Sequence, residues 1–181
     1  MFIDFYQKLF TSEWTQGVED CLGSLEARVT PSMNEDLMQE FTMEDVDAAL
    51  AQKHPFKSPG PNGFSACFYQ RSWATICANV GKALLDFLNF GVFYSSLNIT
   101  HIVLISKIKN HSRITNYRPI SLCNMLYKLM SKVFANRMKW VLNSIISPNQ
   151  SAFLPGRLIT DNVIVAFEAL HSMNTQLKGR K

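Results

Sequence analysis

The sequence predicts an α+β protein that is mostly helical and contains one antiparallel β-hairpin. Long stretches in both halves of the chain carry apolar residues at the three- and four-residue spacing of one helix face. Between them, two short stretches rich in β-branched residues flank a polar loop, which is the pattern of a hairpin. The 181 residues, 47% of them hydrophobic, are enough to bury a core.

The first clear helix is "FTMEDVDAALAQK" (41–53), because Thr42 can cap its start and Asp45 follows three residues later, as in a capping box. It leads into "FKSPGPNGF" (56–64), in which prolines fix the backbone and glycines permit unusual conformations. This loop is either a rigid connector between helices or a stiff support that holds Lys57 and bare amides against phosphate.

A long helix is predicted between Ser65, which can cap it, and Gly91, which can end it. Its apolar face consists of Tyr69, Trp73, Ile76, Val80, Leu84 and Phe87. We interpret this face as core rather than as a platform for stacked bases.

The hairpin strands are "ITHIVLISKI" (99–108) and "NYRPISL" (116–122), which can pair across the polar loop "KNHSRIT". Pro119 confines the second strand to a sheet edge or a strand end. The hairpin and its flanks carry four cations and no acid, namely Lys107, Lys109, Arg113 and Arg118. An isolated hairpin is marginally stable, so this one packs on helices or serves as a mobile flap.

A second amphipathic helix is predicted over 124–146. Its expected buried side is Met130, Val133, Phe134, Met138, Val141 and Ile145. The opposite side is Lys128, Lys132, Asn136, Lys139 and Asn143, which we interpret as a solvated face. A last helix, capped by Thr160 or Asp161, carries the apolar residues Val163, Ile164, Phe167 and Leu170.

The charges divide the chain sharply. Residues 1–50 contain two basic and eleven acidic residues, a net charge of −9, whereas residues 51–181 contain sixteen basic and three acidic residues, a net charge of +13. A basic stretch of this kind favours a polyanion such as a nucleic acid as partner. The alternative is that the acidic leader of the same chain is its partner.

Several classes of protein are not expected. No apolar run is long enough to span a membrane, and the N-terminal residues lack the pattern of a signal peptide. The four cysteines and four histidines are scattered, so we expect free thiols and no structural zinc site.

Three stretches together resemble one family. They are "KSPGPNGF" (57–64), "HIVLISKIKN…NYRPISLCNMLYKLMSKVFANRM" (101–138) and "SPNQSAFLPGRLITDNVIVAFEALH" (147–171). In order and spacing they resemble the reverse transcriptase of LINE-type (non-LTR) retrotransposons, especially the plant members. The resemblance implies a right-handed polymerase, of which this chain covers the mostly helical fingers with their hairpin and only the start of a truncated palm.

The resemblance implies that Lys107 in "LISKI" and Arg118 in "NYRPISL" bind the incoming nucleotide by gripping its triphosphate. Arginine supplies bidentate phosphate geometry and lysine a point charge, so the chemistry agrees. The alternative is that Arg118 anchors the hairpin through backbone carbonyls. Ser106 stands where the family usually has proline, which could loosen the strand end that aims Lys107.

The loop at 57–64 resembles a motif that lies against the template, which implies template–primer binding by Lys57, Gly60 and Gly63. Asn62 replaces the usual aspartate, and we expect it to keep the same local turn bond.

The stretch "NQSAFLPGR" implies that Gln150 and Arg157 also contact the template–primer. The alternative is a loop-to-helix turn in which Arg157 is simply solvated.

The carboxylates that hold two catalytic metal ions in this family come from a palm strand and a Y-A-D-D turn, and neither is present here. Only Asp86, Asp161 and Glu168 are acidic after residue 50. We therefore expect no catalytic residue and no metal site within this chain, and no polymerase activity from it alone, although Mg²⁺ is expected for the intact family enzyme. The alternative function is a non-catalytic remnant that acts at most as an electrostatic nucleic-acid binder.

We expect an acidic helical leader over 1–55 and a partial reverse transcriptase domain over 56–181. The implied partners are an RNA template, a DNA primer and dNTP, with no membrane. Self-association through an exposed palm-facing surface is a further expectation. The family implies an intracellular protein of the nucleus.

Overall fold

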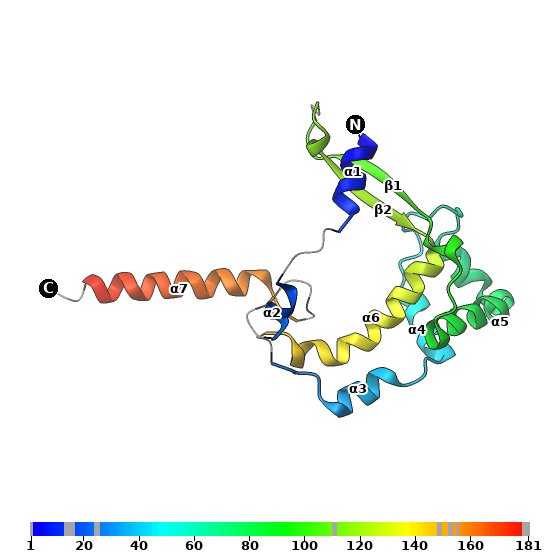
Figure 1. Cartoon of the computed structure of the whole chain (residues 1–181), viewed down its shortest axis with the longest axis horizontal. Helices are drawn as coiled ribbons and strands as arrows, with labels where there is room; N and C mark the ends of the chain where they lie inside the picture. The colour runs from blue at the N-terminus through cyan, green and yellow to red at the C-terminus, as the bar shows by residue number, and fades with distance from the viewer. Residues whose placement is uncertain are drawn as a thin grey trace. The chain divides into compact units, whose positions relative to one another are not determined.

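The computed structural model describes residues 2–12, 17–23, 26–109, 112–147, 150–151, 154 and 156–178. Its elements in chain order are α1 (Phe2–Phe10), α2 (Val18–Gly23), α3 (Pro31–Met38), α4 (Met43–Ala51), α5 (Ala66–Phe90), β1 (Thr100–Ser106), β2 (Tyr117–Cys123), α6 (Met125–Ile145) and α7 (Ile159–Lys178) (Figure 1). Short 3-10 turns precede the strands at Ser95–Asn98 and Ile114–Asn116. The predicted α+β class, mostly helical with one hairpin, is confirmed.

The chain folds as two compact units. The first unit contains Met1–Glu26 and Met38–Asn136, and the second contains Ala27–Leu37 and Arg137–Lys181. The division expected at residue 55 stays a prediction. None of the described helices has the length and apolar character needed to cross a membrane.

Helix α4 begins where the capping box predicts. Thr42 is the N-cap, and its backbone N–H donates to Asp45 Oδ2 at 3.0 Å. The hydroxyl of Thr42 in turn lowers the pKa of Glu44, so the carboxylate of Glu44 in the first turn is favoured in its charged form. Val46, Ala49 and Leu50 form the buried side of the helix.

Helix α5 runs from its N-cap Ser65 to Gly91, whose φ of 70° ends the helix in the left-handed conformation. The six apolar positions expected on one face all lie in or against the core, with Tyr69 and Leu84 fully buried. The core of the first unit is completed by Met125, Leu129, Met130 and Val133 of α6. The interpretation of this aromatic-containing face as core is confirmed.

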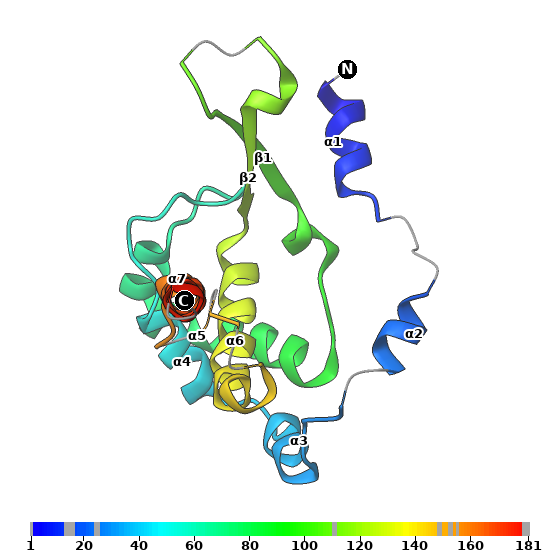
Figure 2. The same ribbon diagram turned by 90° about the vertical axis from the view of Figure 1, so that its left-hand side faces the viewer.

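Strands β1 and β2 pair antiparallel in a two-stranded sheet, with Thr100 opposite Cys123 and Ser106 opposite Tyr117. Five of the seven side chains of β1 are exposed, whereas three of the seven in β2 are. Figure 2 shows the hairpin projecting away from the helices α4 and α5, with α1 beside it. The ring of Phe2 on α1 contacts Tyr117 edge-on at 5.8 Å.

Helix α6 begins one residue later and ends one residue earlier than expected. Met130, Val133 and Val141 are buried as predicted, but Phe134 and Met138 are each 40% exposed. Phe134 lies at the edge of the core, where its ring contacts Phe41 and Phe87 at 5.2 and 6.2 Å. These tertiary partners cannot be read from helical spacing alone.

In the second unit, Arg28 donates a hydrogen bond to the backbone carbonyl of Ile145, the last residue of α6, at 3.3 Å. Helix α7 begins at Ile159, so Thr160 and Asp161 lie in its first turn and the prediction that either caps it is wrong. Its apolar residues Val163, Ile164, Phe167 and Leu170 are between 52 and 71% exposed.

Candidate nucleic-acid interface

Lys107 and Arg118 lie at the same end of the hairpin. Arg118 pairs directly with Ile105 in the sheet register, and Lys107 follows Ser106, the last residue of β1. Both side chains are exposed. The structure therefore places both residues near one end of the hairpin, and their binding of a triphosphate stays a prediction.

The ammonium of Lys107 is held near the tip of the hairpin. Its Nζ donates to Thr115 O at 2.8 Å, and its backbone N–H donates to Asn116 O at 2.7 Å. The second bond extends the ladder beyond Ser106, so serine at this position leaves the strand end ordered. Asn110 and His111 at the tip lie outside the described residues.

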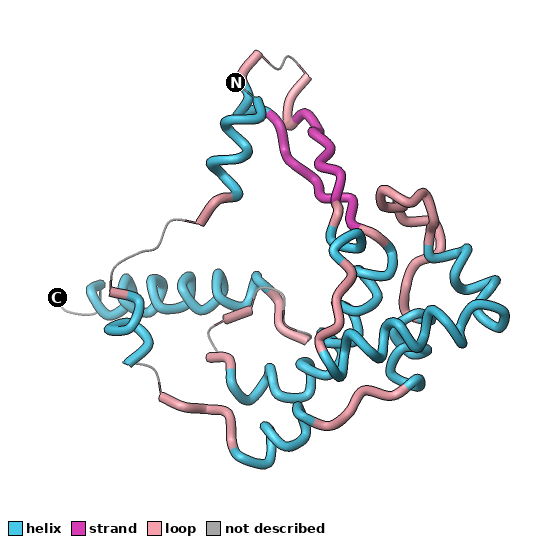
Figure 3. The backbone as a smooth tube through the Cα atoms, turned by 45° about the vertical axis from the view of Figure 1, so that its right-hand side comes forward, coloured by secondary structure: helices cyan, strands magenta, loops and turns pink. Residues whose placement is uncertain are grey.

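The loop over 56–64 is fixed to the junction between β2 and α6 (Figure 3). Gly60 lies so close to this junction that an added Cβ would meet the carbonyl of Cys123 and, at 2.6 Å, the Cα of Asn124. Gly63 has nothing within 4 Å of an added Cβ, but its φ of 76° favours glycine. Gly60 is thus favoured by close packing and Gly63 by its backbone conformation, in addition to the role expected for both against the template.

Asn62 ties the loop to both long helices of the first unit. Its Nδ2 donates to Asn124 Oδ1 at 3.2 Å and to Tyr69 Oη at 3.5 Å, and its Oδ1 accepts from Phe64 N at 3.3 Å. The last bond is the local turn bond that we expected asparagine to keep. Asn124 is itself buried and accepts from Leu126 N at 3.2 Å, which caps α6.

A basic pocket lies where the end of α4, this loop and the start of α6 meet. We call it the lysine pocket; it is lined by Gln52, Lys53, His54, Lys57, Ser58, Pro59, Phe64, Ser65, Ala66, Met125, Lys128 and Lys132. Its volume is about 380 Å³. The lining contains four lysines and, among the residues described there, no carboxylate.

Two lysines of α6 contradict the expectation of a solvated helix face. Lys128 is half-buried and donates from Nζ to Ser58 O at 3.1 Å, and Lys132 is half-buried as well. Lys139 and Asn143, farther along α6, are exposed as expected. The correction has a physical reason, because the loop folds back over the first turns of α6 and covers its basic stripe there.

The lysines of the pocket influence one another. Partial burial, together with repulsion from Lys132, Lys128 and Lys57, lowers the pKa of Lys53 from its usual value of 10.5. The backbone at Lys53 is fixed, since Gln70 Nε2 on α5 donates to Leu50 O at 3.0 Å and to Lys53 O at 2.8 Å. The positive charges are therefore held close together by the fold.

Arg157 binds backbone carbonyls in the second unit. Its Nη1 donates to Ser147 O at 2.6 Å and to Gln150 O at 2.8 Å, and its Nη2 donates to Asn143 O at 3.4 Å. Arg157 is half-buried, so it is not simply solvated. The side chain of Gln150 is exposed. Template–primer contact by these two residues stays a prediction.

No metal centre is visible in the part of the chain that the structure describes, where no three His, Cys, Asp or Glu side chains form a group that could hold an ion. The described cysteines Cys67, Cys77 and Cys123 are free thiols. The side chain of Cys21 lies outside the described residues.

A helical body, a basic hairpin and a basic pocket are features typical of proteins that bind nucleic acid. Comparison with known proteins narrows this class. Residues 108–180 match the family model described as "Reverse transcriptase (RNA-dependent DNA polymerase)". Over 169 residues the chain is 31% identical to the "Transposon TX1 uncharacterized 149 kDa protein" of Xenopus laevis, a match that covers 92% of this chain and 13% of that protein.

The chain therefore carries the sequence of a LINE-type (non-LTR) retrotransposon reverse transcriptase. It spans about one-eighth of the length of the amphibian protein. The family match begins at Ile108 and so includes strand β2 with Arg118, α6 and the expected template–primer residues of the second unit. The narrower resemblance to plant members stays a prediction.

Proposed function

We propose that this chain forms the part of an RNA-directed DNA polymerase that holds the template–primer and the triphosphate of the incoming dNTP. The observation that supports the proposal is the exposure of Lys107 and Arg118 at the same end of a hairpin. A triphosphate requires cations held at a fixed separation, and the hairpin would hold Lys107, directly after β1, near Arg118 on β2. Mg²⁺ and the catalytic carboxylates would be supplied outside this chain.

The hairpin can serve as a flap in this function. Most of its side chains are exposed, and its sheet has only two strands, so few contacts oppose its movement. The bond from Lys107 Nζ to Thr115 O would be exchanged for a phosphate oxygen when a nucleotide arrives. Closing over the nucleotide would order the site before reaction.

The test is binding of a fluorescent dNTP to the chain in the presence of an RNA–DNA template–primer. The double variant Lys107→Gln, Arg118→Gln should raise the Kd at least fivefold. The control Lys8→Gln, Lys82→Gln removes two exposed lysines elsewhere in the first unit and should change the Kd less than twofold. Equal effects of both double variants would contradict the assignment. Primer extension by this chain alone should be undetectable.

A second candidate function is a non-catalytic nucleic-acid binder. The net charge of +13 over residues 51–181 supports binding without any chemistry. Under this function the two double variants would weaken template–primer binding equally, through their charge alone, and neither would affect dNTP binding specifically. Self-association through the exposed apolar residues of α7 belongs to this proposal as well.

A further inference from the structure

The lysine pocket holds charge that the assigned residues do not account for. Of its four lysines only Lys57 belongs to the loop expected against the template, whereas Lys53 lies just after α4, and Lys128 and Lys132 lie on α6. Two segments far apart in the sequence thus bring ammonium groups to one place.

We propose that the lysine pocket binds one phosphodiester group of a single-stranded nucleic acid, and that Phe64 stacks on an unpaired base next to that phosphate. The proposal rests on the proposed function and deepens it, because it names the state of the strand and adds Lys53, Lys128, Lys132 and Phe64 to the contacts.

The charge of the pocket favours a phosphate. Four lysines line it, and no Asp or Glu is among the lining residues. Burial, followed by repulsion from Lys132, Lys128 and Lys57, lowers the pKa of Lys53. An anion placed among them removes that repulsion and forms charge-assisted hydrogen bonds with ammonium donors.

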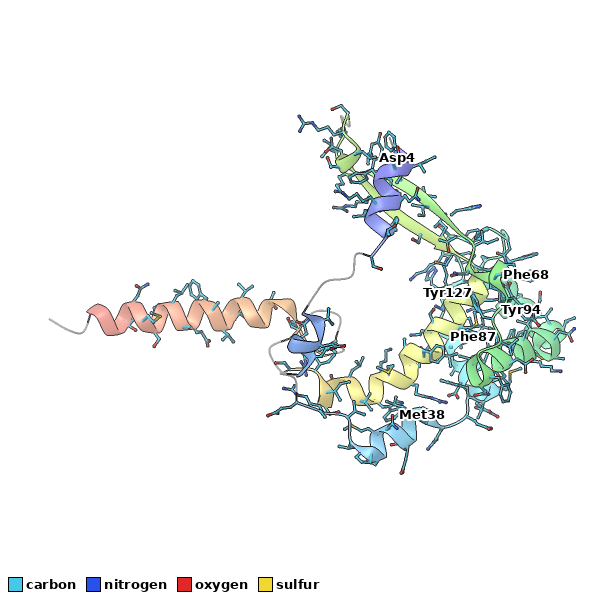
Figure 4. All side chains as sticks on the ribbon, viewed as in Figure 1. Asp4, Met38, Phe68, Phe87, Tyr94 and Tyr127 are labelled. Carbon is cyan, nitrogen blue, oxygen red and sulfur yellow. The ribbon has the colours of Figure 1, made fainter. Side chains whose placement is uncertain are left out.

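The size and aromatic wall favour a nucleotide over a simple ion. A volume of about 380 Å³ falls in the range of small-molecule sites and far exceeds the ~30 Å³ of one water molecule. Phe64 is 46% exposed, and its ring is supported by Phe68, with centroids 4.4 Å apart and planes 30° from parallel. Phe68 lies in the first turn of α5, and Figure 4 shows it near the base of the hairpin.

Phe64 selects for a single strand. Stacking on an aromatic ring requires a base with a free face, which an unpaired nucleotide offers and a base inside a duplex does not. Such stacking is tolerant of sequence, because every base has a π-face. The pocket would therefore hold a strand before it pairs, without preference for one base.

The pocket is preorganised. Gln70 fixes the end of α4, the bond from Lys128 Nζ to Ser58 O fixes the loop, and the close approach of Gly60 to Cys123 fixes the junction with α6. A site whose backbone is already fixed loses little conformational entropy when a strand binds.

The first test measures binding of a fluorescent twelve-residue oligouridylate over a series of salt concentrations. The double variant Lys53→Gln, Lys132→Gln should raise the Kd about tenfold and reduce the slope of log K against log salt by about 0.7, the change for one phosphate contact on a single strand. The control Lys82→Gln, Lys139→Gln makes the same charge change at exposed positions outside the pocket and should raise the Kd less than threefold.

The aromatic contact has its own variant. Phe64→Leu should weaken binding of the oligouridylate at least fivefold and leave binding of a duplex RNA of the same length unchanged. Phe90→Leu is the matched control, because Phe90 is 74% exposed at the end of α5, and it should affect neither probe. Equal weakening of both probes by Phe64→Leu would overturn the assignment to a single strand.

A measurement on the unaltered protein guards against variants that fail to fold. The rates of amine acetylation at Lys53, Lys57, Lys128 and Lys132 should fall at least fivefold when oligouridylate is bound, while the rate at Lys82 stays unchanged. Equal protection of Lys82, or none in the pocket, would overturn the proposal.

Failure of this inference differs from failure of the proposed function. If the pocket variants match their control while Lys107→Gln, Arg118→Gln still loses dNTP binding, the pocket assignment falls and the proposed function stands. If the pocket variants lose oligouridylate binding while the hairpin variant keeps dNTP binding, the pocket assignment stands and the proposed binding of the triphosphate by the hairpin falls.

Discussion

Gly60 and Gly63 lie three residues apart in one loop, and the structure requires glycine at each for a different reason. At Gly60 a side chain would collide with the backbone of Cys123 and Asn124. At Gly63 there is open space, and only the positive φ of 76° favours glycine. Backbone cannot move aside as a flexible side chain can, so the first requirement is the more severe.

We therefore expect Gly60→Asn to lower the free energy of unfolding by about 1–3 kcal/mol or more. Gly63→Asn should lower it by less than about 1 kcal/mol, because asparagine tolerates the left-handed conformation. Urea denaturation of the two variants against the unaltered chain measures the difference. A larger loss for Gly63→Asn would contradict the close approach of the loop to the junction.

The lowered pKa of Lys53 predicts how the stability of the chain depends on pH. Burial and the neighbouring lysines lower its pKa in the folded chain, so its charged form costs stability at neutral pH. That cost diminishes as the pH rises through the lowered pKa, and it is gone above the unfolded pKa of about 10.4. Lys53→Met should therefore unfold at a higher urea concentration than the unaltered chain at pH 7, and the advantage should shrink as the pH rises toward 10.

The control for this prediction is Lys82→Met, at an exposed lysine of α5, which should change stability little at any of these pH values. A stability advantage of Lys53→Met that stays constant with pH would show that burial of the methionine, and not charge, is responsible.

Residue-level prediction from sequence succeeded where the cause is local. The bond from Asn62 Oδ1 to Phe64 and the cap of Thr42 and Asp45 need only residues two or three apart, and both were expected. Lys53 and Lys132 escaped notice because they meet only when the loop folds over α6. A lysine just after α4 and two lysines four apart on α6 were the available signals, and each alone is typical of a solvated surface.

Among the elements, α5 and the hairpin were predicted closely because each carries its own periodicity and end signals. Helix α7 was predicted as a helix, but its start was placed two or three residues late. Serine, threonine or aspartate caps a helix only at the residue just before the first helical turn. The sequence does not show which residue that is.

The exposed apolar side of helix α7 predicts that the chain self-associates. Its exposed apolar residues include Phe167 and Leu170, which are 71 and 61% exposed. We expect the sedimentation coefficient of the chain to rise with concentration, because such a surface favours self-association. Phe167→Ser, Leu170→Ser should remove most of that rise.

Phe90→Ser is the control for self-association, since Phe90 is equally exposed on α5. A chain that sediments as a monomer at all concentrations would contradict the prediction, and so would equal effects of the α7 and α5 variants.

At the scale of the whole molecule, charge is the feature that connects fold and function. The basic residues after position 50 recur on the hairpin, in the lysine pocket and along α6, whereas the acids concentrate before it. The sequence revealed this division and the family together, and the comparison with known proteins confirmed the family. It did not reveal the two compact units, because their cores depend on contacts between segments far apart in the chain.

We propose that this chain binds nucleic acid through its basic residues. The affinity for single-stranded RNA, measured across a range of salt concentrations, tests this proposal most directly. We expect log K to fall linearly with log salt, with a slope that corresponds to several released counterions. Binding that does not depend on salt, or no binding at low salt by a folded chain, would contradict it.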